Sequence, residues 1–526
     1  MKKKIVRICI YSALSFFLLY AYRFKIAECI NAVFYDECVM EELDSSQKME
    51  DFNTFYTVIV ESVPQLDESS KLYGINFKER YEYYREEIER TDNNFEFYCV
   101  MEAIGEEIPS FHTELCFPLY SNLRTLNCYN SRQTLFELGK QSKIEAWNEI
   151  VEEGIQQYED VDILGSKYVS GKYIVDELDL PEYYENMKGC QLIQIDGIDA
   201  DEYLNQNLST FNRNYDYDYN KPYRKYCVFN NKVGKKVSVL WETQNGSQLE
   251  LEMYVDYGAE VAFNYRDIFA TDAVNDNSKT EDIIVYTDDV NELEYIAINN
   301  FTNQDGKFLE KHLKNLKYDT IIIDLRENYG GYIQYAQDYI FPVLYSEDVL
   351  QSYQWLVLSS ESNQCIFNDW RTKLKYEFDK DEDAHYYRRT IKYEGKAKNN
   401  KNVYYLVGMG TGSAADTYIS MIKENKLGTI VGSGTGGEGL GDSYVCRSLP
   451  NSSLIYVYYP SIEFDENTSE EIYGVTLPDV FVDRTEEEYS LWCQMIEEGT
   501  DGLYENKLLH DAALKWVINK KAMYQN

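Results

Sequence analysis

The chain has 526 residues, and 90 Asp and Glu against 51 Lys and Arg give it a formal net charge of -39. Such a surface repels phosphate backbones, which argues against nucleic acid as a partner. Hydrophobic residues make up 44% of the chain and charged residues 27%, an ordinary globular composition that excludes a mostly disordered or fibrous protein.

Histidine and cysteine are too scattered for a zinc site or a disulfide-dense scaffold. The four histidines are His112, His312, His385 and His510, and the 11 cysteines include no CxxC pair. A zinc site of two or three histidines, a zinc ribbon or a finger is therefore not expected. We expect no metal and no cofactor.

The N-terminus has the pattern of an export signal. Lys2–Lys4 and Arg7 precede an uncharged, largely apolar run from Ile8 to Tyr22. As a helix this run would span about 22 Å, less than the roughly 30 Å of a bilayer core. A basic segment before a short apolar run is typical of a secretory signal, but no small-residue cleavage site follows. Residues 1–30 are therefore predicted to be a signal peptide or an uncleaved signal anchor. The remainder is predicted to be exported, either secreted or membrane-anchored at the cell surface.

Residues 31–165 are predicted to form an N-terminal helical region. Between residues 93 and 108, apolar side chains recur close to i, i+3, i+4 spacing, and Pro109 then ends the helix. A second helical stretch, 132–158, is rich in Glu, Lys and Gln.

Residues 166–256 are predicted to form a small β-rich module. Residues 172–175 and 191–195 have the pattern of short strands. The segments 237–241 and 249–255 alternate apolar and polar residues, with Asn245-Gly246 between them. That turn chemistry predicts a β-hairpin.

Residues 257–485 are predicted to form an α/β domain. An apolar strand over 320–325 is followed by Asn328-Tyr-Gly-Gly, and a strand over 403–407 is followed by a glycine-rich loop and a helix over 414–425. Alternating strands and helices predict a largely parallel sheet, covered on both faces. Residues 486–526 are predicted to be a polar helical tail.

Two glycine-bearing loops follow apolar strands of this sheet, at the edge where ligands bind in open parallel sheets. Ser413 lies at the start of a helix between Gly412 and Ala414, where free N–H groups can hold a negative oxygen. Gly330 and Gly331 offer a second backbone donor. The structural alternative is that Ser413 is only a helix cap and that the glycine pair is only a turn.

A serine nucleophile needs a base, and His112 is the candidate because it follows a helix end in Ile108-Pro-Ser-Phe-His-Thr. A lone histidine of this kind also fits a purely structural role.

With these residues in view, residues ~90–485 resemble the tail-specific, or C-terminal processing, serine peptidase family. IIDLRENYGG at 322–331 is similar to the family's IIDLRxNxGG signature, TGSAAD at 411–416 resembles its nucleophile segment, and YGVTLPD at 473–479 resembles its closing GVxPD element. The resemblance implies a ClpP/crotonase-like catalytic core and a PDZ-like role for the β-rich module in binding polypeptide substrates. It also implies a serine endopeptidase that works through an acyl-enzyme.

One departure from the family's pattern indicates which branch of the family the sequence resembles. Members with a Ser–Lys dyad carry Lys in a GKG turn, whereas the corresponding turn here has Glu438. The sequence instead resembles the branch of the tricorn core and its retinoid-binding relatives. That resemblance implies Ser413 as nucleophile, His112 as base and Glu471 as the acid that orients the base.

The same resemblance suggests the supporting groups. The N–H groups of Ala414 and Gly330 are the candidates for the oxyanion hole. The tricorn-type serine directly before the histidine is Phe111 here, so Ser110 and Thr113 are the candidates for that auxiliary role.

Two alternatives stay open at this point. The first is a catalytically inactive relative that binds peptides or apolar ligands in the same cleft. The second is a Ser–Lys enzyme in which Lys423 or Lys426 replaces the missing lysine.

Overall fold

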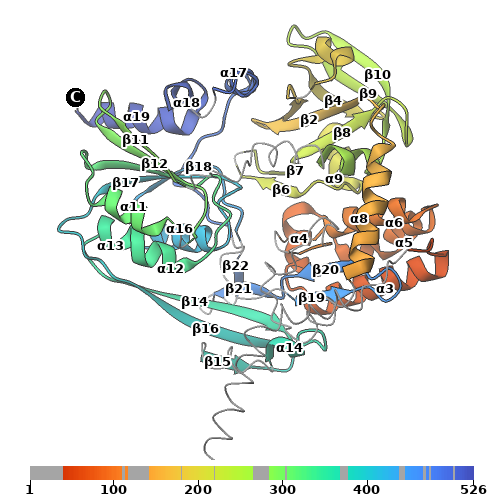
Figure 1. Cartoon of the computed structure of the whole chain (residues 1–526), viewed down its shortest axis with the longest axis horizontal. Helices are drawn as coiled ribbons and strands as arrows, with labels where there is room; N and C mark the ends of the chain where they lie inside the picture. Colours follow the sequence, from red (N-terminus) through yellow and green to blue (C-terminus); the bar gives the residue numbers. More distant parts are fainter. Residues whose placement is uncertain are drawn as a thin grey trace, which may run out of the picture.

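The protein is described by a computed structural model (Figure 1). The structure describes residues 40–108, 110, 113–115, 141–178, 180–217, 219–264, 283–302, 305–367, 377–437, 445–465, 470–472, 475–500 and 504–525. The predicted signal segment 1–30, His112 and Glu438 lie outside these residues.

The part of the chain predicted to be catalytic is built on a mostly parallel sheet. Its described strands are ordered β11-β12-β13-β17-β18-β23, and only β11 runs antiparallel to its neighbour. The bounds are β11 (Ile283–Asp288), β12 (Leu293–Ile298), β13 (Thr320–Asp324), β17 (Asn402–Val407), β18 (Thr429–Gly432) and β23 (Val480–Phe481). The predicted parallel sheet is confirmed, because each crossover returns the chain in the same direction.

Helices cover both faces of this sheet (Figure 1). Along β13, Ile321 and Ile323 join the main hydrophobic core, whereas Ile322 joins a second core on the other face. The first face is covered by α11 (Gly306–Leu313), α12 (Ile333–Tyr335), the π-helical turn η3 (Ala336–Ile340), α13 (Phe341–Leu344) and α16 (Ala414–Glu424). Burial on both faces explains why the strands are continuously apolar.

The second face is covered by the C-terminal segment, which is predicted as a polar tail but docks onto the sheet. It consists of α17 (Glu486–Glu497), α18 (Tyr504–His510) and α19 (Ala512–Gln525). Of these, α18 and α19 pack on the sheet, whereas Tyr489 and Cys493 of α17 pack against Val169 and Ile174 in the region predicted as the β-rich module. Leu514 and Val517 of α19 are fully buried against the sheet. A partly buried guanidinium reinforces the contact, since Arg326 after β13 donates to Asp324 and to Asp511 between α18 and α19. The segment is therefore an integral layer of the fold.

Two antiparallel sheets extend the catalytic part. One has the described strand order β15-β16-β14-β21-β22 and the other β1-β20-β19. Their bounds are β14 (Val349–Leu358), β15 (Glu377–Lys380), β16 (Ala384–Tyr393), β21 (Ser461–Asp465), β22 (Glu470–Ile472), β1 (Glu114–Leu115), β19 (Val445–Ser448) and β20 (Ile455–Tyr458). The short helix α14 (Gln364–Phe367) packs beside them.

The N-terminal region is helical, as predicted. It contains α3 (Ser45–Ser62), α4 (Leu66–Tyr73), the 3-10 turn η1 (Phe77–Arg80), α5 (Tyr81–Glu89), α6 (Asn94–Gly105) and α8 (Gln141–Gln156). The helix α6 begins at a cap, where the Asn93 side chain accepts the N–H of Glu96, and it covers most of the predicted stretch 93–108. The predicted stretch 132–158 corresponds to α8, and its first residues lie outside those that the structure describes.

The β-rich module has the described strand order β3-β2-β8-β10-β9-β4-β5, with a further pairing of β3 and β4 that curls the sheet around its own core. The strands are β2 (Ile163–Val169), β3 (Lys172–Val175), β4 (Gln191–Ile195), β5 (Ile198–Asp199), β8 (Tyr226–Asn230), β9 (Lys235–Glu242) and β10 (Gln248–Val255). The 3-10 turn η2 (Glu182–Met187) and helix α9 (Ala200–Gln206) pack on the sheet. The predicted hairpin at Asn245-Gly246 is confirmed as β9–β10.

Candidate active site

Ser413 has a backbone conformation that serine rarely adopts. It lies between β17 and α16 at φ 51° and ψ -122°. Such a conformation costs about 1–3 kcal/mol and persists only where surrounding contacts impose it. Here the Ser413 N–H donates to the Gly437 carbonyl at 2.9 Å, and the Gly412 N–H donates to the Asn328 carbonyl at 3.0 Å. Strained strand-to-helix turns of this kind present a nucleophile at the edge of a sheet.

The alternative that Ser413 serves only as a helix cap does not agree with the position of its side chain. Ser413 occupies the N-cap position of α16, but its hydroxyl makes no capping hydrogen bond. The N–H of Ala414 has no acceptor among the described residues. Among the described residues, an uncapped hydroxyl therefore lies next to a helix N-terminal donor without an acceptor, and such a donor favours a negative oxygen.

Gly330 lies directly against the nucleophile loop. A Cβ atom built on Gly330, which has φ +106°, would lie 2.7 Å from the Ser413 Cβ and 3.0 Å from the Ala414 nitrogen. The two glycine-bearing loops predicted to converge thus do so, and only glycine permits this approach. The Gly330 N–H, a predicted oxyanion donor, already donates to the Asn328 side-chain oxygen at 2.9 Å. The neighbouring N–H of Gly331 has no acceptor among the described residues.

Asn328 organises this junction, although its local sequence pattern predicts no role for it. Its buried side chain accepts the N–H of Gly330 and donates to the Ile298 carbonyl at the end of β12. Its backbone carbonyl accepts from Gly412. In the sequence, Asn328 is a polar residue between an apolar strand and a glycine pair. Its role depends on contacts with residues far away in the sequence, so the local pattern does not reveal it.

A second residue without an assigned role, Asp416, lies in the first turn of α16. Its carboxyl group is 4% exposed and accepts the Thr435 hydroxyl at 2.5 Å and the Thr476 N–H at 3.3 Å. Burial raises the pKa of Asp416 to about 6, because its hydrogen-bond partners are neutral. The contacts join the nucleophile helix to the loop after β18 and to the segment that follows Glu471.

His112 lies outside the described residues, but both ends of its segment are placed. The Thr113 hydroxyl donates to the Ser110 hydroxyl and accepts the N–H of Tyr459, both at 2.9 Å. The strand β1, two residues after His112, pairs with β20. Both candidate auxiliary hydroxyls are buried here.

The backbone of Glu471 lies in β22 and pairs with Phe464 of β21, while its side chain is not among those described. The continuous segment 455–465 therefore borders both the His112 segment and Glu471. This neighbourhood is compatible with the predicted triad, and the contact of the three side chains with one another stays a prediction.

The two lysines considered as replacements lie at the far end of α16. Lys423 is ten residues after Ser413, about 15 Å along a helix, and its ammonium group contacts the Leu477 carbonyl. Lys426 follows the helix in a left-handed conformation. The turn that carries lysine in the Ser–Lys branch does reach the nucleophile, since Gly437 accepts the Ser413 N–H.

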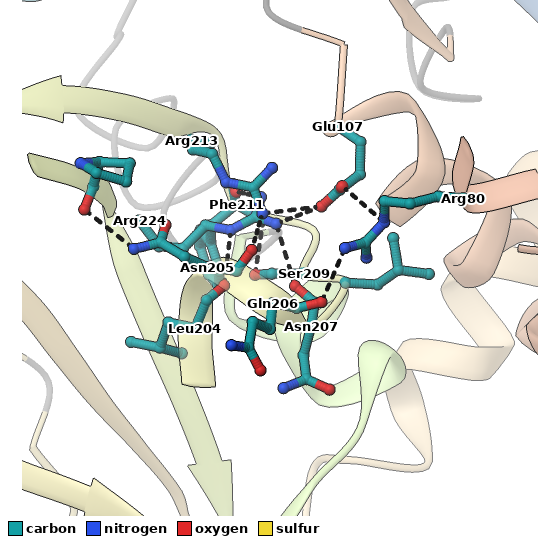
Figure 2. A network of polar contacts seen from close by, with 12 residues as sticks. Arg80, Glu107, Leu204, Asn205, Gln206, Asn207, Ser209, Phe211, Arg213 and Arg224 are labelled. Carbon is teal, nitrogen blue, oxygen red and sulfur yellow. Dashed lines mark hydrogen bonds and ion pairs between the residues drawn. The ribbon is translucent and has the colours of Figure 1, made fainter. Parts of the chain in front are cut away.

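A buried ionic cluster, the Glu107 cluster, lies just before the His112 segment (Figure 2). Glu107 is 1% exposed and pairs with Arg224 at 2.7 Å, Arg213 at 3.1 Å and Arg80 at 3.4 Å. Burial alone would raise the pKa of Glu107, but the three guanidinium groups outweigh it and lower the pKa. The cluster contains an excess of positive charge over Glu107.

Backbone carbonyls, which accept hydrogen bonds from the arginines, stabilise this excess positive charge. The arginines donate to the carbonyls of Leu204, Asn205, Gln206, Asn207 and Phe211, as Figure 2 shows. The first three belong to the last turn of α9, where carbonyls have no partner inside the helix. Cations are favoured at such an end. The cluster therefore joins the N-terminal helices to the β-rich module.

No described group of three or more His, Cys, Asp or Glu side chains could hold a metal ion. None of the described helices is long and apolar enough to cross a membrane. The six cysteines that the structure records as free are Cys99, Cys190, Cys227, Cys365, Cys446 and Cys493.

Comparisons with known proteins address the fold and the family. The chain is similar to a mutant of CPAF with a TM-score of 0.50 and 11% identity, covering 86% of this chain and 97% of that one. It is also similar to mature CPAF complexed with lactacystin (TM-score 0.47, 12% identity, 88% and 99% covered) and to the photosystem II D1 C-terminal processing protease (0.33, 13%, 84% and 94%). No curated protein matches the sequence.

The family assignment comes from the sequence itself. Residues 292–481 match the model described as peptidase family S41. This range contains the strands β13, β17 and β18, the glycine loop at Gly330 and the strained Ser413. The predicted resemblance and the mixed α/β fold class are therefore confirmed: residues 292–481 carry the match to peptidase family S41, and the protein is a serine-type peptidase.

Proposed function

We propose that the protein is an endopeptidase that cleaves polypeptides through an acyl-enzyme on Ser413, with His112 as general base and Glu471 as the acid that orients it. The observation that carries the proposal is the strained Ser413, whose Cβ lies against Gly330 and whose hydroxyl makes no capping hydrogen bond. Beside it, the Ala414 N–H has no acceptor among the described residues. A serine used only as a helix cap needs neither the strain nor the glycine contact.

The reaction follows the general triad scheme. The Ser413 oxygen attacks the scissile carbonyl carbon while its proton passes to the His112 imidazole, which then protonates the leaving amine. Water hydrolyses the acyl-enzyme with the same imidazole as base. The N–H of Ala414 and an N–H of the Gly330-Gly331 pair stabilise the negative oxygen of both tetrahedral intermediates. Gly330 can serve only if its N–H leaves Asn328, whereas Gly331 can serve without that change.

The β-rich module is proposed to bind the substrate chain, as PDZ-like modules do by strand addition. Its sheet closes through one residue pair, Ile174 with Gln191. An extended peptide would find most of the β3 edge unpaired beside that single bridge. Deleting the module should impair long substrates more than short ones, and equal loss on both would contradict this role.

A hydroxyl-reactive fluorophosphonate probe tests the activity directly. The wild type should be labelled on Ser413, and Ser413→Ala should lose both labelling and peptide cleavage, by about 10⁶ in rate. Lys423→Ala is the matched control, because it alters the same helix away from the nucleophile. A wild type that binds peptides but is never labelled would instead support the inactive, ligand-binding alternative.

The pH dependence tests the base. An ordinary imidazole loses its proton near pH 6.5 and a lysine near 10.4, so activity should rise through about pH 6.5–7.5 and then level off. His112→Ala should remove the whole profile, while Lys426→Ala should leave it unchanged. An active His112→Ala variant would show that the base lies elsewhere.

We also propose that the catalytic part is exported and held at, or released from, the cell surface through residues 1–30. The basic Lys2–Lys4 beside the apolar run Ile8–Tyr22 supports this, with the lysines on the cytoplasmic side. Fractionation of the full-length chain tests it, and a cytoplasmic soluble protein would overturn it.

A further inference from the structure

A hairpin of the β-rich module stands apart from the module's own sheet. The strands β6 (Arg213–Asp216) and β7 (Lys221–Arg224) pair only with each other among the described strands. Figure 1 shows them between the β-rich sheet and the catalytic sheet. A two-stranded hairpin is at best marginally stable alone, so contacts with neighbouring elements must hold it. Along its length, Tyr168 of β2 stacks on Tyr223 at 4.0 Å and donates to Asp216.

The base of the hairpin is anchored in the Glu107 cluster. Arg213 and Arg224 face each other across the two strands, and both donate to the same Glu107 carboxylate oxygen. Their side chains are 2% and 0% exposed. Glu107 lies five residues before His112, so the base of the hairpin is tied to the segment proposed to carry the catalytic base.

The tip of the hairpin reaches the Gly434 loop, which follows β18. Tyr217 follows β6, and a methyl group added to Gly434 would lie 3.4 Å from the Tyr217 ring and 3.3 Å from Val475. The Tyr217 ring therefore packs over Gly434. Tyr215 supports the ring from the same strand, with centroids 5.0 Å apart.

Gly434 belongs to a loop that contacts the nucleophile directly. Three residues on, Gly437 accepts the Ser413 N–H. Thr435, beside Gly434, donates to Asp416 in the first turn of α16. A shift of the Gly434 loop would therefore move both the Ser413 backbone and its helix.

We propose that the β6–β7 hairpin is a positioning strut of the peptidase, in which Tyr217 holds the Gly434 loop beside Ser413 and the Glu107 cluster fixes the hairpin base. Tyr217 is thus a positioning residue that acts through Gly434 and Gly437, and the inference rests on the proposed role of Ser413. The strut fixes the position of the Gly434 loop relative to Glu107. Misplacement of reacting groups by about 1 Å costs on the order of 100-fold in rate, so the effect should appear in kcat.

The test compares three variants on one short peptide substrate. Tyr217→Ala should lower kcat by about 10-fold to 100-fold with KM changed less than about twofold, and should slow fluorophosphonate labelling in parallel. Tyr217→Phe should keep kcat near the wild-type value, because the ring contact remains. Tyr219→Ala is the matched control, since Tyr219 lies in the same turn and is 53% exposed. All variants are measured below their unfolding temperatures.

Several outcomes would overturn the strut. An unchanged kcat in Tyr217→Ala would do so, as would an equal loss in Tyr219→Ala or in Tyr217→Phe. A failure of the proposed function looks different: Ser413→Ala would still cleave, or the wild type would never be labelled.

The anchor is tested by a double-mutant cycle. Glu107→Gln should also lower kcat, and adding Tyr217→Ala to it should lower kcat little further, because both changes release the same strut. If the two losses in kcat simply multiply, the anchoring role of the Glu107 cluster is overturned. If Glu107→Gln does not fold, Arg80→Lys at the more exposed edge of the cluster takes its place in the cycle, with the same criterion.

Discussion

Glu107 and Asp416 are both buried carboxyl groups next to the active site, but their partners differ in charge. Glu107 meets three guanidinium groups, which lower its pKa. Asp416 meets a hydroxyl and a backbone N–H, and its pKa rises to about 6. Two similarly buried carboxyl groups therefore have pKa values shifted in opposite directions. The direction of the shift depends on whether charged or neutral donors surround the group.

The Glu107 cluster and the Ser413 region also differ in the interactions that stabilise them and in what those interactions keep in place. The Glu107 cluster joins two parts of the chain that have separate cores, and it does so with charges removed from water. The Ser413 region is held by backbone hydrogen bonds and close glycine contacts, at the expense of local strain. The first arrangement resists separation of the parts, and the second presents a reactive group in one geometry.

The largest expected effect on stability comes from a change in the Glu107 cluster. Glu107→Gln should lower the free energy of unfolding by about 3–5 kcal/mol, because it leaves the buried guanidinium groups of Arg213 and Arg224 without their anion. Urea unfolding measures the change. Glu486→Gln is the control, since its ion pair with Lys172 is about half exposed and should contribute less than about 1 kcal/mol. Similar losses in both variants would contradict the importance of burial.

The pH dependence of stability should separate the two carboxyls. The folded-state pKa of Asp416 lies above its ordinary 3.8, so its stabilising contribution is present below pH 3.8 and is lost as pH rises through about 6. Unfolding free energies of the wild type and Asp416→Asn should therefore diverge by about 3 kcal/mol between pH 4 and 7.

For Glu107 the sign is reversed. Its lowered pKa gives a contribution that is present above its ordinary value and is lost only in acid. The difference between the wild type and Glu107→Gln should thus stay constant from about pH 5 to 7. A difference that varies in this window as it does for Asp416→Asn would contradict the assignment.

A smaller effect concerns the glycine contact on the nucleophile side. Gly330→Ala should slow labelling of Ser413 by about 100-fold, because the new methyl group would displace the serine. Gly234→Ala is a matched control, since Gly234 has the same φ of +106° but lies in the β-rich module. Both variants should lose stability, and only Gly330→Ala should lose reactivity.

The smallest expected effect is the change in stability when the backbone strain at Ser413 is relieved. Ser413→Gly should be more stable than Ser413→Ala by about 1 kcal/mol, because glycine accepts φ 51° whereas alanine keeps the strain. Both variants are inactive, so thermal unfolding compares them without a contribution from catalysis. Equal stabilities would mean that the turn at Ser413 is not strained.

Much of the fold and part of the candidate site could be predicted because their signals are local. The strand over 320–324, the hairpin at Asn245-Gly246 and the helix after Ser413 follow from apolar periodicity and turn chemistry within a few residues. The convergence of Gly330 and Ser413 also follows, since parallel strands place the loops at their carboxyl ends along one edge. The roles of His112 and Glu471 rest on resemblance and stay predictions.

The sequence by itself thus determined the α/β class, the family segment and the loop that carries Ser413, all of which depend on neighbours along the chain. Only the tertiary structure decided that Glu107 meets Arg213 and Arg224, more than 100 residues away, and that Tyr217 lies over Gly434. A charged residue has the same local pattern whether it is solvated or buried. Its partner depends on how whole elements pack, and no short segment of sequence records that.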